Sequence, residues 1–184
     1  MTHPLRPTAT LFIAILAATI LVRAGRAAEP PGVDADAKAA LQKLYASEPV
    51  AKMLGEKAKA VLVFPSIVKA GFIIGGQYGE GALLKGGTIV AHYNSVAASY
   101  GLQAGAQKFG YALFLMNDKA LEYLDKSSGW ELGVGPTIVV VDKGKAKSLT
   151  STTLRDDVYA FIFSQKGLMA GIGLQGSKIT RVNP

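Results

Sequence analysis

The sequence of 184 residues contains no cysteine, two histidines and one tryptophan, and these shortages exclude several kinds of protein. Without cysteine there is no disulfide framework, and the acylated cysteine that anchors bacterial lipoproteins is absent as well. A zinc site usually needs several Cys, His or acidic ligands, and the sequence offers no recognisable set of them. His3 falls in a predicted leader, so His92 is the only imidazole of the mature chain. The sequence therefore predicts no metal site.

The motifs of common enzymes are missing too. There is neither a Gly-x-Ser-x-Gly nucleophile turn nor a phosphate-binding loop that ends in Gly-Lys-Ser/Thr. Residues 171–176 match the dinucleotide-binding pattern, but only eight residues follow, too few for the helix and the acidic residue that this fingerprint requires. Asp156 and Asp157 are adjacent, so on a strand they would point to opposite faces, and we interpret them as a turn. The sequence predicts neither an enzyme nor a cofactor.

The N-terminal segment has the layout of a secretory signal peptide. Arg6 precedes an apolar run over residues 9–22, and residues 25–27 form a small-x-small cleavage site. The run is shorter than the roughly 20 residues that span a bilayer as a helix. Arg23 and Arg26 before the cut are unusual, so retention as an N-terminal anchor is the alternative. We predict a signal peptide over 1–27, a linker over 28–36, a domain over 37–184, and export to the periplasm or envelope.

The charge balance is basic. The whole chain has a formal net charge of +7, and loss of a leader with three arginines and no acid reduces it to +4. A modest positive surplus suits anionic lipid headgroups or other envelope polyanions. Export argues against nucleic acid as a partner, and the sequence contains no nucleic-acid-binding motif.

The hydrophobic pattern predicts two short helices followed by strands. Apolar residues recur with helical spacing from Ala37 to Tyr45, and a second helix follows Ser47. From Ala60 the pattern changes to strands: 61–64 (stopped by Pro65), 71–78, 82–93, 97–107, 111–116, 137–141, 158–164, 168–174 and 178–182, with a short helix capped by Asn117. We predict an α+β fold, a curved and largely antiparallel sheet resembling a half-barrel, with short N-terminal helices and one short internal helix.

Glycines recur on these strands in a Gly-apolar-x-x-Gly pattern. The pattern occurs at 71–75, 101–105 and 167–171. Glycines four residues apart lie on one face of a strand, and strand glycines mark bends or close approach of another backbone or ligand. The sequence thus predicts a tightly curved sheet with smooth strips, packed against a helix of the same protein or against a lipid.

Two groups of lysines are candidates for lipid contact. The first comprises Lys52, Lys57, Lys59 and Lys69, near the apolar Phe72, and the second comprises Lys143, Lys145 and Lys147. The second group alternates around a predicted turn at 142–145, so on a strand its members would share one face. Each lysine near an anionic membrane contributes roughly 1 kcal/mol of attraction. The alternative is that these lysines are solvated and keep the domain soluble.

A longer pattern resembles the signature of the SYLF domain family. The matching segments keep order and spacing over roughly residues 37–180: 58–72, 75–81, 101–107, 114–117, 165–171 and 176–177. Two features depart from the family: residues 92–96 stand where many relatives have Gly-Trp-x-x-Pro, and the amphipathic N-terminal segment of eukaryotic members is replaced by the signal peptide and a short helix.

The resemblance implies binding without catalysis. SYLF domains bind phospholipids, and eukaryotic members bind phosphoinositides and, in fungi, actin filaments. We therefore predict a non-catalytic phospholipid-binding protein of the bacterial envelope, attracted to anionic membranes through the lysine groups. The alternative is a periplasmic structural or protein-interaction module without a lipid ligand.

Overall fold

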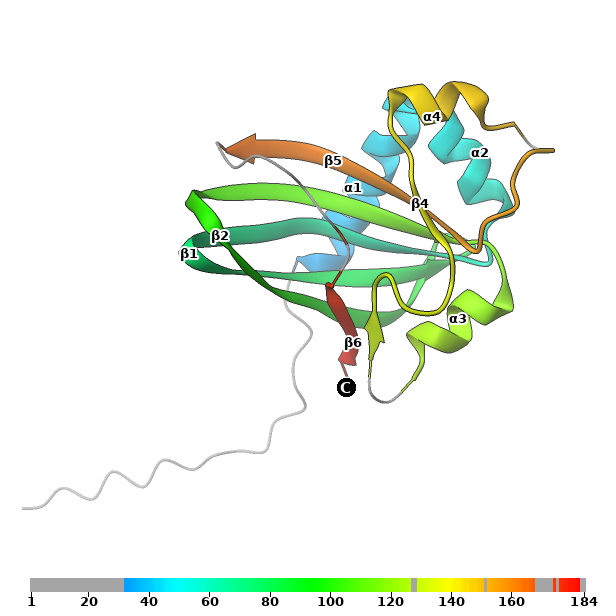
Figure 1. The fold of residues 1–184 in the computed structure, drawn as a ribbon. Helices are drawn as coiled ribbons and strands as arrows, with labels where there is room; N and C mark the ends of the chain where they lie inside the picture. Colours follow the sequence, from blue (N-terminus) through cyan, green and yellow to red (C-terminus); the bar gives the residue numbers. More distant parts are fainter. Residues whose placement is uncertain (1–31, 127–128, 151, 168–173, 175, 183–184) are drawn as a thin grey trace, which may run out of the picture.

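The computed structural model describes residues 32–126, 129–150, 152–167, 174 and 176–182, and Figure 1 shows a curled sheet with helices against it. The predicted α+β class is confirmed. The helices and strands in chain order are α1 (Val33–Ser47), α2 (Pro49–Lys57), β1 (Ala60–Lys85), β2 (Thr88–Leu115), α3 (Asp118–Leu124), β3 (Trp130–Glu131), β4 (Ile138–Val140), α4 (Lys143–Ser148), β5 (Val158–Gly167) and β6 (Lys178–Val182).

The centre of the fold is one very long hairpin of β1 and β2. Its turn is Gly86–Gly87, where both φ angles are positive (56° and 82°), a conformation that favours glycine. From there the strands pair, with three register shifts, as far as Ala60 opposite Leu115. A straight strand of 26 residues would be about 85 Å long. Instead the hairpin bends back on itself at the glycine-rich stretches 71–75 and 101–105, which produces the half-barrel (Figure 1).

The bend divides the hairpin into two arms. We call residues 60–71 with 105–115 the first arm, residues 73–85 with 88–101 the second arm, and their junction the fold-back end. α2, α3 and α4 lie at the other end of the sheet, the helical end (Figure 1). The two arms of β1 approach each other closely. A Cβ atom at Gly79 would lie 2.6 Å from the carbonyl oxygen of Ser66, and one at Gly81 would lie 2.7 Å from that of Val63.

The remaining strands extend the sheet from β2. β5 pairs with β2 in the first arm and β6 pairs with β2 in the second, both antiparallel. β4 runs parallel to β5, and β3 pairs with β6. Among the described residues the sheet therefore has six strands and only one parallel pairing. The predicted curved and largely antiparallel sheet is confirmed.

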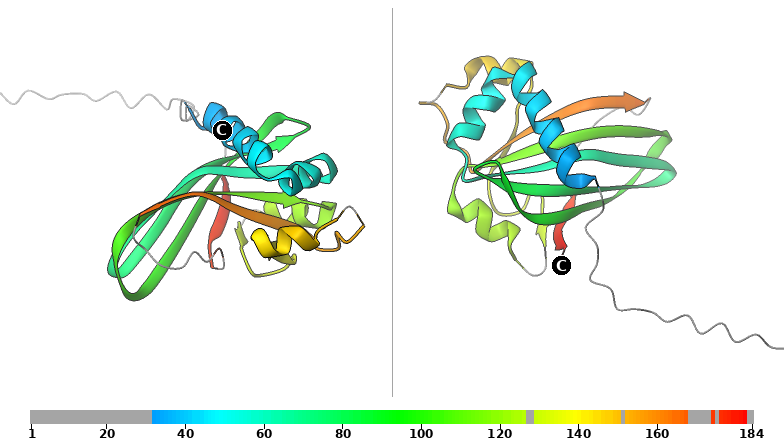
Figure 2. Two further views of the ribbon diagram at one scale, coloured as in Figure 1. Left: turned by 90° about the horizontal axis from the view of Figure 1, so that it is seen from above. Right: turned by 180° about the vertical axis from the view of Figure 1, so that it is seen from behind.

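A hydrophobic core lies on each face of the sheet. The inner, concave face packs Phe64, Tyr111 and Leu113 against α3 and Trp130. Trp130 is buried, and its indole N–H donates to the carbonyl of Val134 at 3.0 Å. The outer face collects alternate residues of the same strands and is covered by α1, α2 and the β4–α4 segment. Figure 2 shows α1 on the convex side and β6 on the concave side.

Both N-terminal helices are confirmed, and α1 has a polar attachment to the sheet. It begins at Val33, inside the segment predicted as a linker over 28–36. Leu41 and Leu44 of α1 are buried in the outer core. His92 Nε2 of β2 lies 2.7 Å from the carboxylate of Asp34 in the first turn of α1. The predicted signal peptide, residues 1–27, lies outside the described residues.

Three local predictions differ from the structure. Pro65 does not stop the strand, because a bulge between Phe64 and Ile67 accommodates it within β1. The predicted strand 82–93 contains the hairpin turn, and residues 79–81 and 94–96, which separate predicted strands, are continuous strand. Gly79 and Gly81 allow close packing of the two arms rather than a reversal of the chain. The predicted strand 168–174 lies outside the described residues except for Leu174.

Candidate functional site

The lysines of the first predicted group do not lie together. Lys52 and Lys57 are exposed on α2, and Lys59 follows it, all at the helical end. Lys69 lies ten residues further along β1, a separation of about 33 Å on an extended strand. It pairs with Gln107, which pairs with Gly167, the last residue of β5. Lys69 therefore lies at the fold-back end.

The second predicted group is on a helix, and the expected turn at 142–145 is wrong. Asp142 is the N-cap of α4, and its carboxylate accepts a hydrogen bond from the backbone N–H of Lys145 at 2.7 Å. Positions two apart on a helix are about 200° apart around its axis. Lys145 thus lies on the opposite side from Lys143 and Lys147, so the three do not share one face as predicted.

Positive and negative charges alternate at the helical end. Lys59 lies 3.6 Å from the carboxylate of Asp118, and both side chains are exposed. Lys52 on α2 lies four residues from both Glu48 and Glu56, a spacing that brings side chains together on a helix. This mixed pattern is typical of a solvated surface. It weakens the case for the helical end as an attractor of anions.

Among the described residues, the fold-back end has lysines and no acidic residue. The sequence has no Asp or Glu between Glu80 and Asp118, and none after Asp157. These acid-free stretches contain the β2 and β5 residues of the fold-back end. Lys108 and Lys166 are exposed there, and Lys69 is half-buried on the inner face. Lys108 and Lys166 are not among the lysines predicted from the sequence, although the long intervals without acid are visible in it.

Apolar side chains are exposed beside these lysines. Val68 is 52% exposed and pairs with Lys108, and Ile74 is 64% exposed just after the bend in β1. Phe72, predicted as an apolar contact, lies in β1 three residues after Lys69. Phe72 and Lys69 are thus the two members of the first predicted site that lie at the fold-back end.

Ser164, at the end of β5, has a strained backbone. Its φ of 54° is the only positive value on a non-glycine residue in the described part of the chain. It falls in a register shift between β2 and β5, where Gly110 pairs with Phe163 but Lys108 pairs with Lys166. β5 therefore has one extra residue here, which is a β-bulge.

Replacing Ser164 by glycine is expected to stabilise the fold by about 0.5 kcal/mol, because relief of the left-handed backbone outweighs the added freedom of the unfolded chain. Chemical denaturation measures the change. The control is Gln165→Gly in the same bulge, which relieves no positive φ and is expected to destabilise by about 0.5 kcal/mol. Equal losses in both variants would contradict the assignment of strain to Ser164.

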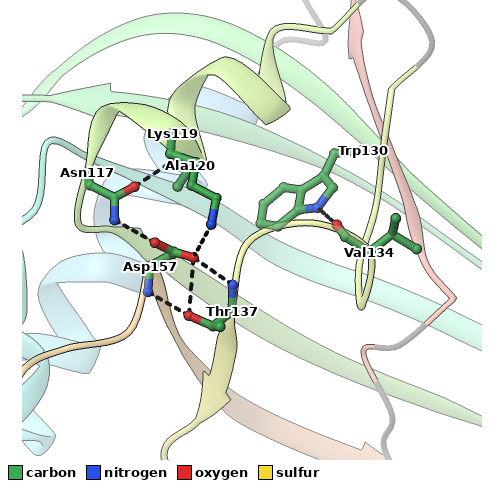
Figure 3. A network of polar contacts seen from close by, with 7 residues as sticks. All are labelled: Asn117, Lys119, Ala120, Trp130, Val134, Thr137 and Asp157. Carbon is green, nitrogen blue, oxygen red and sulfur yellow. Dashed lines mark hydrogen bonds and ion pairs between the residues drawn. The ribbon is translucent and has the colours of Figure 1, made fainter.

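The densest polar network lies elsewhere, around Asp157 (Figure 3). Its carboxylate accepts hydrogen bonds from the Asn117 amide at 2.7 Å, the Thr137 backbone N–H at 2.8 Å and Lys119 at 3.2 Å. The Asn117 hydrogen bond, followed by that of Thr137, lowers the pKa of Asp157 to about 2. Asn117 also caps α3, as predicted, by accepting from the N–H of Ala120. The network joins α3, β4 and β5, and its carboxylate is fully engaged, which is typical of a structural junction.

Polar side chains also occur on the inner face between the arms. Gln77 donates to the Ser177 hydroxyl at 2.8 Å, and Tyr111 donates to that of Ser95 at 2.8 Å. These residues are buried, so they do not line an open polar groove. Within the described ranges, no group of three or more His or acidic side chains is arranged to hold a metal ion.

Residues 96–183 match the model of the Ysc84 family, described as "Las17-binding protein actin regulator". Ysc84 proteins carry the SYLF domain, so the match confirms the predicted resemblance over this segment. The matched segment, residues 96–183, includes Lys108 and Lys166. It does not include α1, α2 or β1. The family is associated with lipid binding and actin regulation. No curated protein matches the chain. Among the helices that the structure describes, none is long and apolar enough to cross a membrane.

Proposed function

We propose that this protein is a non-catalytic phospholipid-binding protein that attaches to anionic membranes through its fold-back end. The observation that carries the proposal is the segregation of charge: lysines without acids at one end, and mixed charges at the other. The association of the family with lipid binding supports it. Export is proposed because residues 1–27 have the layout of a signal peptide. An exported protein would contact the anionic phospholipids of the bacterial envelope.

The energetics favour a reversible attachment. A lysine near an anionic bilayer contributes about 1 kcal/mol, so Lys69, Lys108 and Lys166 together contribute about 3 kcal/mol. Val68 and Ile74 add shallow apolar contact at the same end. Attraction between exposed charges is screened by salt, with a Debye length of about 8 Å at physiological ionic strength. Binding of this kind falls steeply as salt rises.

The variant K108Q/K166Q is expected to bind anionic vesicles about 30-fold more weakly than the unchanged domain, since two lysine–membrane attractions are lost. Both side chains are exposed, so the fold is retained. Co-sedimentation with phosphatidylglycerol vesicles at low and high salt measures the change, and neutral vesicles give the background.

The matched control is K52Q/K57Q, which removes the same charge from exposed positions at the helical end. We expect this control to bind within a factor of about two of the unchanged domain. Loss of binding in the control, with K108Q/K166Q unaffected, would place the site on α2 instead. Absence of binding to any anionic vesicle would refute the proposal as a whole.

One observation favours the second function, a protein-interaction module. Tyr78 and Val96 form a pair on the outer face of the second arm, several residues from the bend. Their side chains are 49% and 50% exposed. Exposed apolar residues in one place are typical of contact surfaces for proteins. Salt separates the two functions, because apolar contact with a partner persists at an ionic strength that releases a membrane held by lysines.

A further inference from the structure

A row of three side chains crosses the outer face of the sheet at the fold-back end. Val68 of β1 pairs with Lys108 of β2, and Lys108 pairs with Lys166 of β5. Opposed residues on antiparallel strands point to the same face, with Cβ atoms about 4.5–5.5 Å apart. Lys108 and Lys166 are therefore direct neighbours, and both are exposed.

This arrangement is unfavourable for the isolated protein. Like charges directly opposite each other destabilise a sheet. The β2 and β5 stretches around the pair contain no acid that could compensate the two charges. In the described part of the chain, the ion pairs join other groups: Lys59–Asp118, His92–Asp34, Lys119–Asp157 and Arg181–Asp125.

The bulge at Ser164 creates the pair. If the pairing continued from Phe163 and Gly110 without interruption, Gln165 would lie opposite Lys108. The extra residue moves Lys166 into that position and onto the outer face. The chain thus keeps a non-glycine residue in a left-handed conformation, and one result is that two like charges face each other. Strain retained in this way is a recurrent mark of binding sites.

We propose that Lys108 and Lys166 form a clamp for one phosphate group with two negative charges, the phosphomonoester headgroup of a membrane lipid. This inference rests on the proposed membrane-binding function. A dianion between two ammonium groups replaces their repulsion by two attractions, whereas a phosphodiester has only one charge to share. Lysine is a compact charge on a flexible stem, so both ammonium groups reach the same phosphate. Val68 extends the row with an apolar side chain.

The test compares phosphatidic acid with phosphatidylglycerol in phosphatidylcholine vesicles matched for surface charge. At about pH 7.5 the unchanged domain is expected to bind the phosphatidic acid vesicles about fivefold more tightly, the factor that one additional lysine–headgroup attraction gives. K108Q/K166Q is expected to bind both kinds equally. K52Q/K57Q, the charge-matched control, is expected to keep the preference.

The pH dependence gives a second readout. A phosphate monoester loses its second charge below a pKa of about 6, so the preference is expected to vanish at about pH 5. The row itself consists of Val68, Lys108 and Lys166, and Lys69 lies on the opposite face, so the row contains neither a histidine nor a carboxylate.

Equal binding of the two lipids at about pH 7.5, or a preference that survives in K108Q/K166Q, would overturn the clamp while leaving general anionic binding intact. Failure of the proposed function has a different signature, namely no binding to either anionic vesicle. Soluble glycerol 3-phosphate presents the same phosphate to the two lysines without a bilayer. Binding of this ester to the free domain as tight as binding to phosphatidic acid vesicles would overturn the membrane headgroup as the ligand.

Discussion

Alanine in place of Gly79 or Gly81 is expected to lower the free energy of unfolding by about 3 kcal/mol, at the upper end of what overpacking costs. The new Cβ atom would lie 2.6 Å from the Ser66 carbonyl oxygen in the first case and 2.7 Å from that of Val63 in the second. Backbone atoms cannot rotate away, so one arm of β1 must move. For a domain of this size the loss corresponds to a melting temperature lower by roughly 6–12 °C.

Gly76→Ala is the matched control on the same strand. The nearest neighbour of its new Cβ atom would be the carbonyl oxygen of Ala97 at 3.7 Å, which is ordinary van der Waals distance. We expect a change of less than about 0.5 kcal/mol. Thermal unfolding followed by circular dichroism measures all three variants. If Gly76→Ala destabilised as much as the other two, the loss would come from the glycine position in a strand and not from contact between the arms.

Asp157→Asn is expected to destabilise the fold by about 2 kcal/mol at neutral pH, because hydrogen bonds to an ionised acceptor are lost or weakened. The depressed pKa of Asp157 also predicts a pH dependence. A carboxyl group with a lower pKa in the folded state contributes stability above its unfolded pKa of about 3.9, and this contribution disappears as the pH falls toward 2. The unchanged protein is therefore expected to lose this stability between about pH 4.5 and pH 2. The variant lacks this carboxyl group, so its stability is expected to show no such loss.

The control for this prediction is Asp156→Asn, the same change at the neighbouring residue. Asp156 accepts only the Tyr159 hydroxyl, at 3.3 Å, among the interactions described for its carboxylate. Urea denaturation between about pH 2 and pH 7 compares the variants. Parallel pH profiles for Asp157→Asn and the unchanged protein would show that the junction of α3, β4 and β5 does not depend on this carboxylate.

The fold class could be predicted because it follows from local sequence patterns that specify helices and strands. The helical spacing in α1 and α2, the cap at Asn117 and the alternation in β5 and β6 are all visible in the sequence. The long hairpin could not be predicted in the same way. A strand glycine that admits a neighbouring backbone has the same local signature as a turn glycine, and only the approach of the two arms distinguishes Gly79 and Gly81 from Gly86.

The candidate site was predicted only in part, for a geometric reason. Residues close in sequence were grouped together, but an extended strand carries Lys69 far from Lys59. Lys108 and Lys166 are distant in sequence, and the pairing of β2 with β5 joins them. Lys108 lies directly opposite Lys166 only because of the bulge at Ser164. A register shift of this kind follows from the assembled sheet, and no local pattern indicates it.

The bend in the hairpin has a consequence for how this domain can diverge. The β1 and β2 parts of the fold-back end are strand interiors, and residues on either side of the bend are paired. Insertion of one residue on either side would exchange inner and outer faces along the rest of the arm. The fold-back end can therefore vary in side chains but hardly in length. Related chains are expected to align without gaps over residues 66–79, and to differ in length in the connections around 132–137 and 149–157.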